Sequence, residues 1–191
     1  KSFLSKILER KTMDEHIKKI SNEIGNKYES ISNKKIFVDK MPSNFYWVGF
    51  IKLLFPNSKI IHISRNIKDN CLSIYKNMFG SSDMDWSYSE QNIFKFVMNY
   101  RDIMKYWIGK YKEDIYEIRY ENLVQNKVEE TKKLFGFCEM KWDEKIFDFY
   151  KNVKTIRTVS VNQVKKPIYS SSIDSSSNYI NYFQHLNKLE D

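Results

Sequence analysis

An arginine and a serine eight residues apart form the pattern in this sequence that most directly indicates a binding site. Arg65 follows the apolar run 59–64, which predicts a strand, and Asn66 is a suitable N-cap for a helix after it. A helix N-terminus attracts anions, and a guanidinium grips a phosphate group at two points. Arg65, this helix N-terminus and the Ser73 hydroxyl would together bind a phosphate group. Alternatively, Arg65 pairs with Asp69 and Ser73 is solvated.

Two further candidates follow the strands predicted at 36–38 and 114–119. Lys40 comes just after the first, where a positive charge can stabilise negative charge developing on a transferred group. A solvated lysine in a turn is the alternative. Tyr120 comes just after the second strand, where it contacts a base or phosphate group or else packs on the next helix. Ligands of parallel sheets bind beyond the carboxyl ends of the strands, so these positions are the ones to examine.

A long segment, 151–177, is rich in serine and lysine and has no clear period, which predicts a loop. Its part 157–167 combines hydroxyls, amides and two lysines, a composition that suits a flap over an anion. The alternative is a loop that is merely flexible and soluble.

Several other kinds of site are not indicated. The three histidines fall on separate elements, and His62 lies within an apolar strand, which favours a satisfied core histidine. No Ser-His-Asp or HExxH pattern occurs, so no metal is expected. Cys71 falls on the apolar face of its helix and is predicted to be inert. Neither Cys71 nor Cys138 belongs to a CxxC pair, so a zinc site or disulfide framework is not expected.

The elements that must position these residues alternate between helix and strand. A continuous apolar strand between helices predicts a parallel sheet covered on both faces, hence an α/β fold flanked by helices. The segment 1–27 predicts one amphipathic helix or two short ones, and Gly25-Asn26 should end it. The other predicted helices span 45–55, 67–78, 89–110, 127–135, 143–150 and 179–189.

Composition sets the broad class of the protein. With 191 residues and 41% hydrophobic residues, the chain should form a single domain, 1–191, with a proper core. No apolar run reaches the roughly 18 residues of a membrane span, and the first 30 residues are too charged for a signal peptide. We therefore expect a cytoplasmic protein with reduced thiols and no membrane partner. The net charge of +8 favours anionic partners such as nucleotides or acidic polymers, but no recognised nucleic-acid motif occurs.

Taken together, four stretches resemble the sulfotransferase family, especially its bacterial and tyrosylprotein-type branch. They are VDKMPSNF at 38–45, FPNSKIIHISRNIKDNCLSIY at 55–75, IRYENLV at 118–124 and SVNQVKKPIY at 160–169. The second is the most specific, because Arg65 and Ser73 fall where the family places its 3′-phosphate-binding Arg and Ser. The resemblance implies a P-loop-containing nucleotide hydrolase-like fold. It also implies the donor 3′-phosphoadenosine 5′-phosphosulfate, with sulfuryl transfer to a hydroxyl or amine acceptor.

The resemblance also implies a role for each matching residue. Arg65 and Ser73 would hold the 3′-phosphate, with Tyr120 beside the nucleotide. Lys40 would bridge to the transferring sulfuryl group. The flap residues follow: Ser160 would stabilise the transition state, and Gln163, Lys165 and Lys166 would close over the donor. Sulfuryl transfer spreads charge over oxygens, so positioning and fixed positive charge should do most of the catalysis.

Two departures from the family pattern bear on activity. The Gly-rich loop for the 5′-phosphosulfate, its strand and the usual acidic base would precede the residues present, so the resemblance implies a domain truncated at its N-terminus. The late Gly-Arg/Lys-Trp element would fall at 174–176, which carries neither a basic residue nor a ring. A catalytically inactive fragment that keeps the 3′-phosphate half-site and binds nucleotides or polyanions therefore remains an alternative. The acceptor, an acidic peptide or glycan among others, and homo-oligomerisation stay open.

Overall fold

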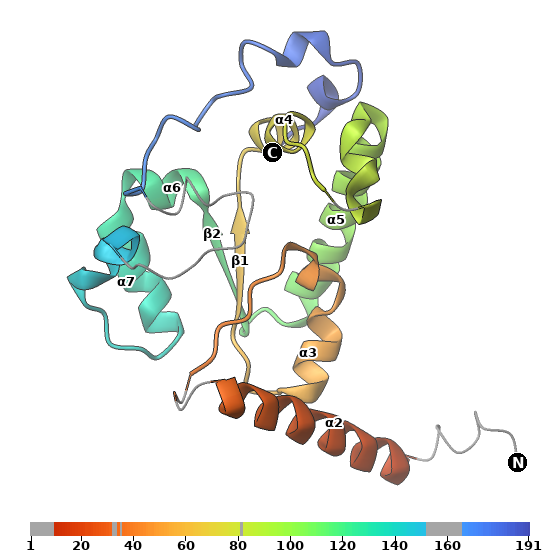
Figure 1. Cartoon of the computed structure of the whole chain (residues 1–191), viewed down its shortest axis with the longest axis vertical. Coiled ribbons are helices and arrows are strands. Elements are labelled where there is room, and N and C mark those ends of the chain that lie inside the picture. Colours follow the sequence, from red (N-terminus) through yellow and green to blue (C-terminus); the bar gives the residue numbers. More distant parts are fainter. Residues whose placement is uncertain (1–9, 32–33, 35, 81, 152–165) are drawn as a thin grey trace, which may run out of the picture.

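The computed structural model describes residues 10–31, 34, 36–80, 82–151 and 166–191 (Figure 1). Helices surround a small sheet of strands β1 (Ile60–Ser64) and β2 (Ile115–Arg119). The α-helices are α2 (Arg10–Ile31), α3 (Val48–Leu54), α4 (Ile67–Tyr75), α5 (Glu90–Lys110), α6 (Tyr120–Gln125) and α7 (Lys127–Phe137). The 3₁₀-helices are η1 (Pro42–Tyr46), η2 (Ser82–Tyr88), η3 (Glu144–Lys151), η4 (Ile180–Tyr182) and η5 (Leu186–Lys188).

The two strands are parallel, as the sequence predicts, and their register pairs Ile60 with Ile115 and Ser64 with Arg119. The connection between them runs through α4 and α5. In Figure 1, α3 and α5 lie on one side of the strands and α6 and α7 on the other. The expected helix-rich α/β architecture with a parallel sheet is confirmed. Because parallel strands end at the same edge, Arg65 and Tyr120, which follow β1 and β2, lie near one another.

The expectation that the sheet is covered on both faces is wrong for β1. Burial alternates along this strand, and Ile61 and Ile63 are exposed. The opposite face of β1 is covered by α5, whose Tyr100 reaches His62. α7 packs against β2, where Tyr116 contacts the Phe137 ring, and among the described residues no helix covers the face of β1 that carries Ile61 and Ile63. The apolar composition of a strand therefore does not determine whether one or both of its faces are buried.

The strand predicted at 36–38 does not form. These residues have no neighbouring strand among the described residues, and Val38 is 87% exposed. An apolar segment becomes a strand only where another strand accepts its backbone hydrogen bonds. The segment instead contacts α2, where the Tyr28 hydroxyl donates to Asp39 at 2.6 Å and the Tyr28 ring stacks on Phe37.

Several helix boundaries also differ from the prediction. α2 runs through Gly25 and Asn26 to Ile31, since a glycine inside a helix weakens it without ending it. The region 45–55 is divided between η1 and α3, and 144–151 forms a 3₁₀-helix. The predicted terminal helix at 179–189 is replaced by η4 and η5, two short 3₁₀ turns.

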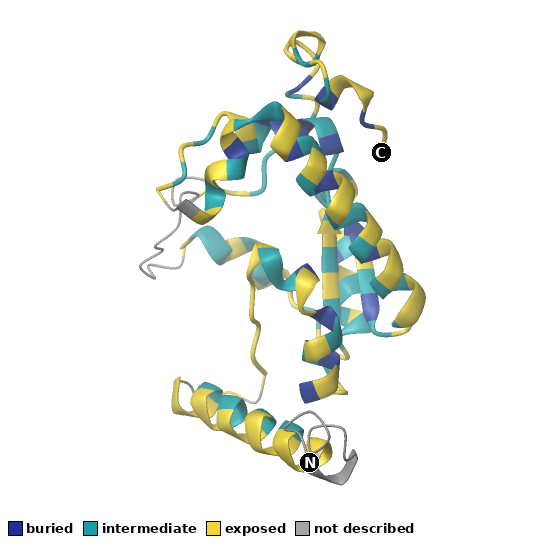
Figure 2. Cartoon of the chain, turned by 90° about the vertical axis from the view of Figure 1, so that its right-hand side faces the viewer, coloured by how far each residue is buried: buried dark blue, intermediate teal, exposed yellow. Residues whose placement is uncertain are grey.

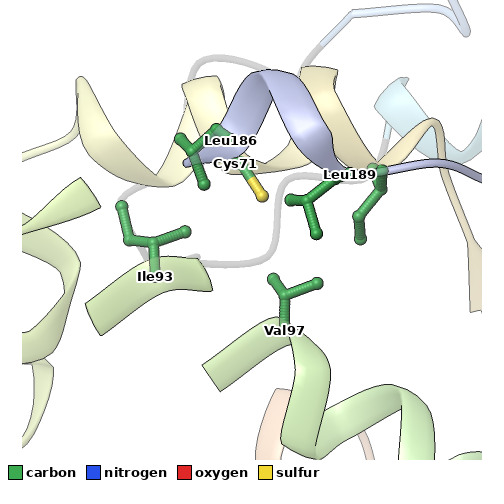
Figure 3. Close-up of a cluster of buried hydrophobic side chains, with 6 residues drawn as sticks. Cys71, Ile93, Val97, Leu186 and Leu189 are labelled. Carbon is green, nitrogen blue, oxygen red and sulfur yellow. The ribbon is translucent and has the colours of Figure 1, made fainter. Parts of the chain in front are cut away.

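The main buried cluster lies at the carboxyl edge of the sheet. It joins α4, α5 and the region of η5 and the residue after it, through Ile67, Cys71, Ile93, Val97, Leu186 and Leu189 (Figure 3). Figure 2 shows buried residues along α5 and its neighbours, whereas α2 carries none among the side chains described. Cys71 is fully buried, and burial raises the pKa of its thiol to about 12, which keeps it protonated as predicted for an inert cysteine.

His62 has partners for both ring nitrogens, as predicted for a satisfied histidine, but it is half-buried and does not belong to the core. Its Nε2 contacts the Tyr100 hydroxyl, and its Nδ1 lies 3.4 Å from Glu117 on the neighbouring strand. Burial raises the pKa of Tyr100, and the nearby Glu117 carboxylate adds to the shift. The phenol therefore stays protonated at neutral pH.

Replacing Gly49 by alanine should destabilise the protein by about 1–3 kcal/mol, the usual range for an overpacked core site. An added Cβ would lie 2.4 Å from the Trp107 ring. The ring cannot move aside freely, because its Nε1 donates to the Phe45 carbonyl at 2.9 Å and it stacks on Tyr111. Chemical denaturation measures the change in unfolding free energy.

The matched control is Gly25→Ala in the middle of α2, where a Cβ would meet nothing within 4 Å. Alanine has the higher helix propensity, so this variant should gain up to about 1 kcal/mol. A Gly49→Ala protein as stable as the wild type would show that the Trp107 ring relaxes without cost.

Candidate functional site

Arg65 occupies the two-residue connection between β1 and α4. Asn66 caps α4, with its side-chain oxygen accepting from the Asp69 backbone N–H at 3.0 Å. The Asn66 backbone N–H donates to Glu121 at 2.8 Å. This capping fixes the path of the chain at the end of β1 and so directs the Arg65 side chain.

The Arg65 guanidinium is held on three sides. It lies over the Tyr120 ring, 5.3 Å from the centroid, and 3.8 Å from the Asp69 carboxylate. Its Nη2 also donates to the Ser172 backbone carbonyl. Its Nε is buried without a hydrogen-bond partner among the described residues. Of the two alternatives for Arg65, the structure contains the ion pair with Asp69, and the buried Nε is left without a hydrogen bond among the described residues.

Asp69 is fully buried, although helical periodicity put it on the polar side of α4. Its Oδ1 accepts from the Ser176 backbone N–H at 2.7 Å and from the Ser175 hydroxyl at 3.3 Å. A carboxylate buried away from water needs such donors. Asp69 thus joins Arg65 to the segment 166–191, which covers this part of α4.

A second arginine lies beside the first site. Arg119 ends β2 and is placed opposite Ser64 by the strand register. Its guanidinium lies 3.5 Å from Glu121 and donates to Asp191 at 3.1 Å. The other Asp191 oxygen accepts from the Ile67 backbone N–H at 2.8 Å, and Asn66 Nδ2 donates to Asp191 at 2.9 Å.

The pKa of Asp191 is lowered by this arrangement. Burial alone would raise it, but hydrogen bonds from the Ile67 backbone and from Arg119 outweigh burial. The pKa of Arg119 is raised, chiefly by its hydrogen bond to Asp191. The carboxylate and the guanidinium therefore hold each other in the charged form at neutral pH.

Of the predicted phosphate ligands, Arg65 and Tyr120 are brought together. The Tyr120 hydroxyl also donates to the Tyr169 carbonyl at 3.2 Å, so the tyrosine touches the covering segment. Ser73 is half-buried on α4, one turn beyond Asp69 and on the same face of the helix. It is not among the contacts that the structure gives for Arg65.

The remaining predicted site residues lie elsewhere. Lys40 is exposed in the segment after 36–38, whose described contacts are with α2 and not with Arg65. Lys166 is exposed at the start of the covering segment. Ser160, Gln163 and Lys165 lie outside the described residues.

Sequence reasoning missed Arg119, Glu121 and Asp191. The first carries a signal that could have found it, since Arg119 is the last residue of the predicted strand 114–119 and only five arginines occur. Asp191 has no local signal, because 124 residues separate it from Ile67.

Other parts of the described chain offer less chemistry. An open hollow of about 490 Å³ lies between α3 and the end of α5, lined by Lys52, Lys110 and Tyr111 among others, away from the Arg65 site.

Within the described residues, no cluster of three or more His, Cys, Asp or Glu side chains is arranged to hold a metal ion. In the same part of the chain, no helix is both long and apolar enough to span a membrane.

Comparison with known proteins agrees with this architecture. A family model described as the sulfotransferase family matches residues 4–144, which include β1, α4 and β2. An uncharacterized protein of Aquifex aeolicus (strain VF5) is 34% identical over 164 residues. That match covers 81% of this chain and 22% of the relative, so the chain spans only about a fifth of the relative's length. On the family match over most of its length, this chain belongs to the sulfotransferase family.

Proposed function

We propose that the carboxyl edge of the sheet binds the adenosine 3′-phosphate of 3′-phosphoadenosine 5′-phosphosulfate. The observation that carries the proposal is the Arg65 guanidinium, set between β1 and α4 on the Tyr120 ring, with its buried Nε free of a hydrogen-bond partner among the described residues. A guanidinium next to a helix N-terminus suits a phosphate group, because both supply charge-assisted hydrogen bonds. Ser73 would supply a hydroxyl from the same helix.

The reaction proposed is sulfuryl transfer from this donor to a hydroxyl or amine. Lys40 would bridge to the transferring group, and Ser160 would stabilise the charge that develops on its oxygens. Gln163, Lys165 and Lys166 would close over the donor. Family membership supports sulfuryl transfer in general. The donor, the acceptor and each residue's role are part of the proposal.

Binding without turnover is the second candidate function. It is favoured by the position of Lys40, which is exposed and, within the described residues, not in contact with Arg65. Incubation of the chain with the donor separates the two candidates. Formation of 3′,5′-adenosine diphosphate in the presence of a hydroxyl acceptor supports transfer, and selective binding without product supports the second function.

Thermal unfolding tests the phosphate site directly. We expect 3′,5′-adenosine diphosphate to raise the melting temperature more than 5′-adenosine monophosphate at the same concentration, because only the former carries the 3′-phosphate. Arg65→Ala should abolish the difference. Arg65→Lys, which keeps the charge but loses the planar fork, should retain part of it.

Lys110→Ala is the matched control, since it removes one positive charge beside the distant hollow. It should leave the difference between the nucleotides unchanged. Equal stabilisation of the wild-type protein by both nucleotides would refute the proposed site.

A further inference from the structure

The N-terminus of α4 is occupied by an anion of the chain itself. The Asp191 carboxylate accepts from the Ile67 backbone N–H, from Asn66 Nδ2 and from Arg119, at 2.8, 2.9 and 3.1 Å. A helix N-terminus, an amide and a guanidinium are the donors that a phosphate group would use. Asp191 therefore uses donors that the proposed ligand needs.

The segment that brings Asp191 to this place is anchored at several points. Leu186 and Leu189 are buried between α4 and α5. Glu90, at the start of α5, accepts from the backbone N–H groups of His185 and Leu186. Burial would raise the pKa of Glu90, but these backbone hydrogen bonds outweigh it and lower the pKa. The position of Asp191 thus follows from the packing of the segment before it.

The charges around α4 are unfavourable for a further anion. Two guanidinium groups, Arg65 and Arg119, face the three carboxylates of Asp69, Glu121 and Asp191. A phosphate group would meet the least electrostatic repulsion if one of these carboxylates moved away from the site. Asp69 is fully buried, and the Glu121 carboxylate is held by the Asn66 backbone. The Asp191 side chain is 32% exposed and can turn towards solvent.

We propose that Asp191 is an internal competitor for the nucleotide 3′-phosphate. In the free protein its carboxylate holds the α4 N-terminus and Arg119, and a bound nucleotide displaces it. The chain is then binding-competent only in the fraction of molecules where Asp191 has left, which lowers the apparent affinity by that fraction. This regulation rests on the phosphate site proposed above.

Isothermal titration with 3′,5′-adenosine diphosphate tests the competition. Asp191→Asn keeps an oxygen that can accept from the Ile67 backbone but loses the charge that binds Arg119. We expect it to bind the diphosphate about tenfold more tightly than the wild type does. Affinity for 5′-adenosine monophosphate should not change. A purely structural role for Asp191 would give weaker binding instead of this gain.

Glu190→Gln is the matched control, because it removes the same charge from the adjacent residue. The contact that the structure gives for Glu190 is through its backbone carbonyl, which accepts from Arg101. Its affinity for the diphosphate should equal that of the wild type. Tighter binding by both variants would assign the effect to net charge and overturn the specific competition.

The wild-type protein provides a measurement that does not depend on the variant folding. Displacement of Asp191 by 3′,5′-adenosine diphosphate should speed backbone hydrogen exchange at residues 187–191. Slower exchange there would contradict the competition. If the wild type binds the diphosphate selectively but Asp191→Asn binds no tighter, the competition is wrong and the phosphate site stands. If neither protein distinguishes the two nucleotides, the phosphate site itself is wrong.

Discussion

Replacing Asp69 by alanine should lower the free energy of unfolding by about 3 kcal/mol, the scale for losing a buried charged hydrogen-bond partner. The side chain is fully buried, and its loss would leave the Ser176 backbone N–H, which is itself buried, without a hydrogen-bond acceptor. It would also remove the carboxylate beside the Arg65 guanidinium. Urea denaturation followed by circular dichroism gives the change.

The same variant should release the segment that covers α4. Ser175 and Ser176 contact α4 through Asp69, so limited proteolysis should cut the region 170–178 faster in Asp69→Ala than in the wild type. Asp69→Asn keeps the shape and one acceptor oxygen, so it should lose clearly less stability. Asp102→Ala, an exposed carboxylate on α5, is the control and should change stability by less than about 0.5 kcal/mol. Equal effects of Asp69→Ala and Asp102→Ala would show that the buried contacts contribute nothing.

The elements that sequence reasoning predicted well have local causes. β1 follows from a run that is mostly β-branched and apolar, and α4 from a cap at Asn66 followed by apolar residues on one face. α5 begins where its cap Ser89 accepts from Asn92. In each case the signal lies within a few residues of the element it determines, so it can be found without knowing the rest of the fold.

The errors have causes that lie outside the local sequence. Residues 36–38 have the composition of a strand, but whether they pair depends on a neighbour that no local pattern reports. The region 179–189 has helical spacing, yet Leu186 and Leu189 are drawn into the core between α4 and α5. Packing there determined the backbone more strongly than helix propensity did.

In the candidate site, too, some features have local causes and others depend on distant parts of the sequence. The position of Arg65 directly after a strand could be predicted, and its role as a ligand-binding residue stays a prediction that rests on where parallel sheets bind their ligands. The residues that surround Arg65 could not be predicted, because they come from distant parts of the sequence. Ser176 reaches Asp69 across 107 residues of sequence, and helical periodicity assigned Asp69 to solvent because it does not report what covers a helix.

The covering segment changes how the site should be understood. It supplies a carbonyl to Arg65 through Ser172 and two donors to Asp69, and it places the Asp191 side-chain carboxylate at the α4 N-terminus. The segment thus forms hydrogen bonds with polar groups that water would otherwise solvate. A ligand binding to Arg65 must exchange some of these contacts for its own, so affinity depends on the segment as well as on the arginine.

The second large effect concerns a buried lysine far from this site. Asp114→Ala should destabilise the protein by about 2–3 kcal/mol, because it leaves the Lys52 ammonium buried without its carboxylate. The Lys52 side chain is 5% exposed and lies 2.9 Å from Asp114. This value is below the roughly 3–5 kcal/mol for a fully buried pair, since the Asp114 side chain is 34% exposed and water can partly replace it.

Lys52→Met tests the physical reason, because it breaks the same ion pair from the other side. Methionine has about the length of lysine and replaces its apolar stem, but it lacks the ammonium group. The remaining Asp114 carboxylate can be solvated. The carbonyls of Pro56 and Ser58 lose their lysine donor, but both belong to a surface turn. Lys52→Met should therefore cost less than about half as much as Asp114→Ala in the same denaturation experiment. Equal costs would mean that the ion pair stabilises through its attraction alone, and that burial of the unpaired ammonium adds nothing.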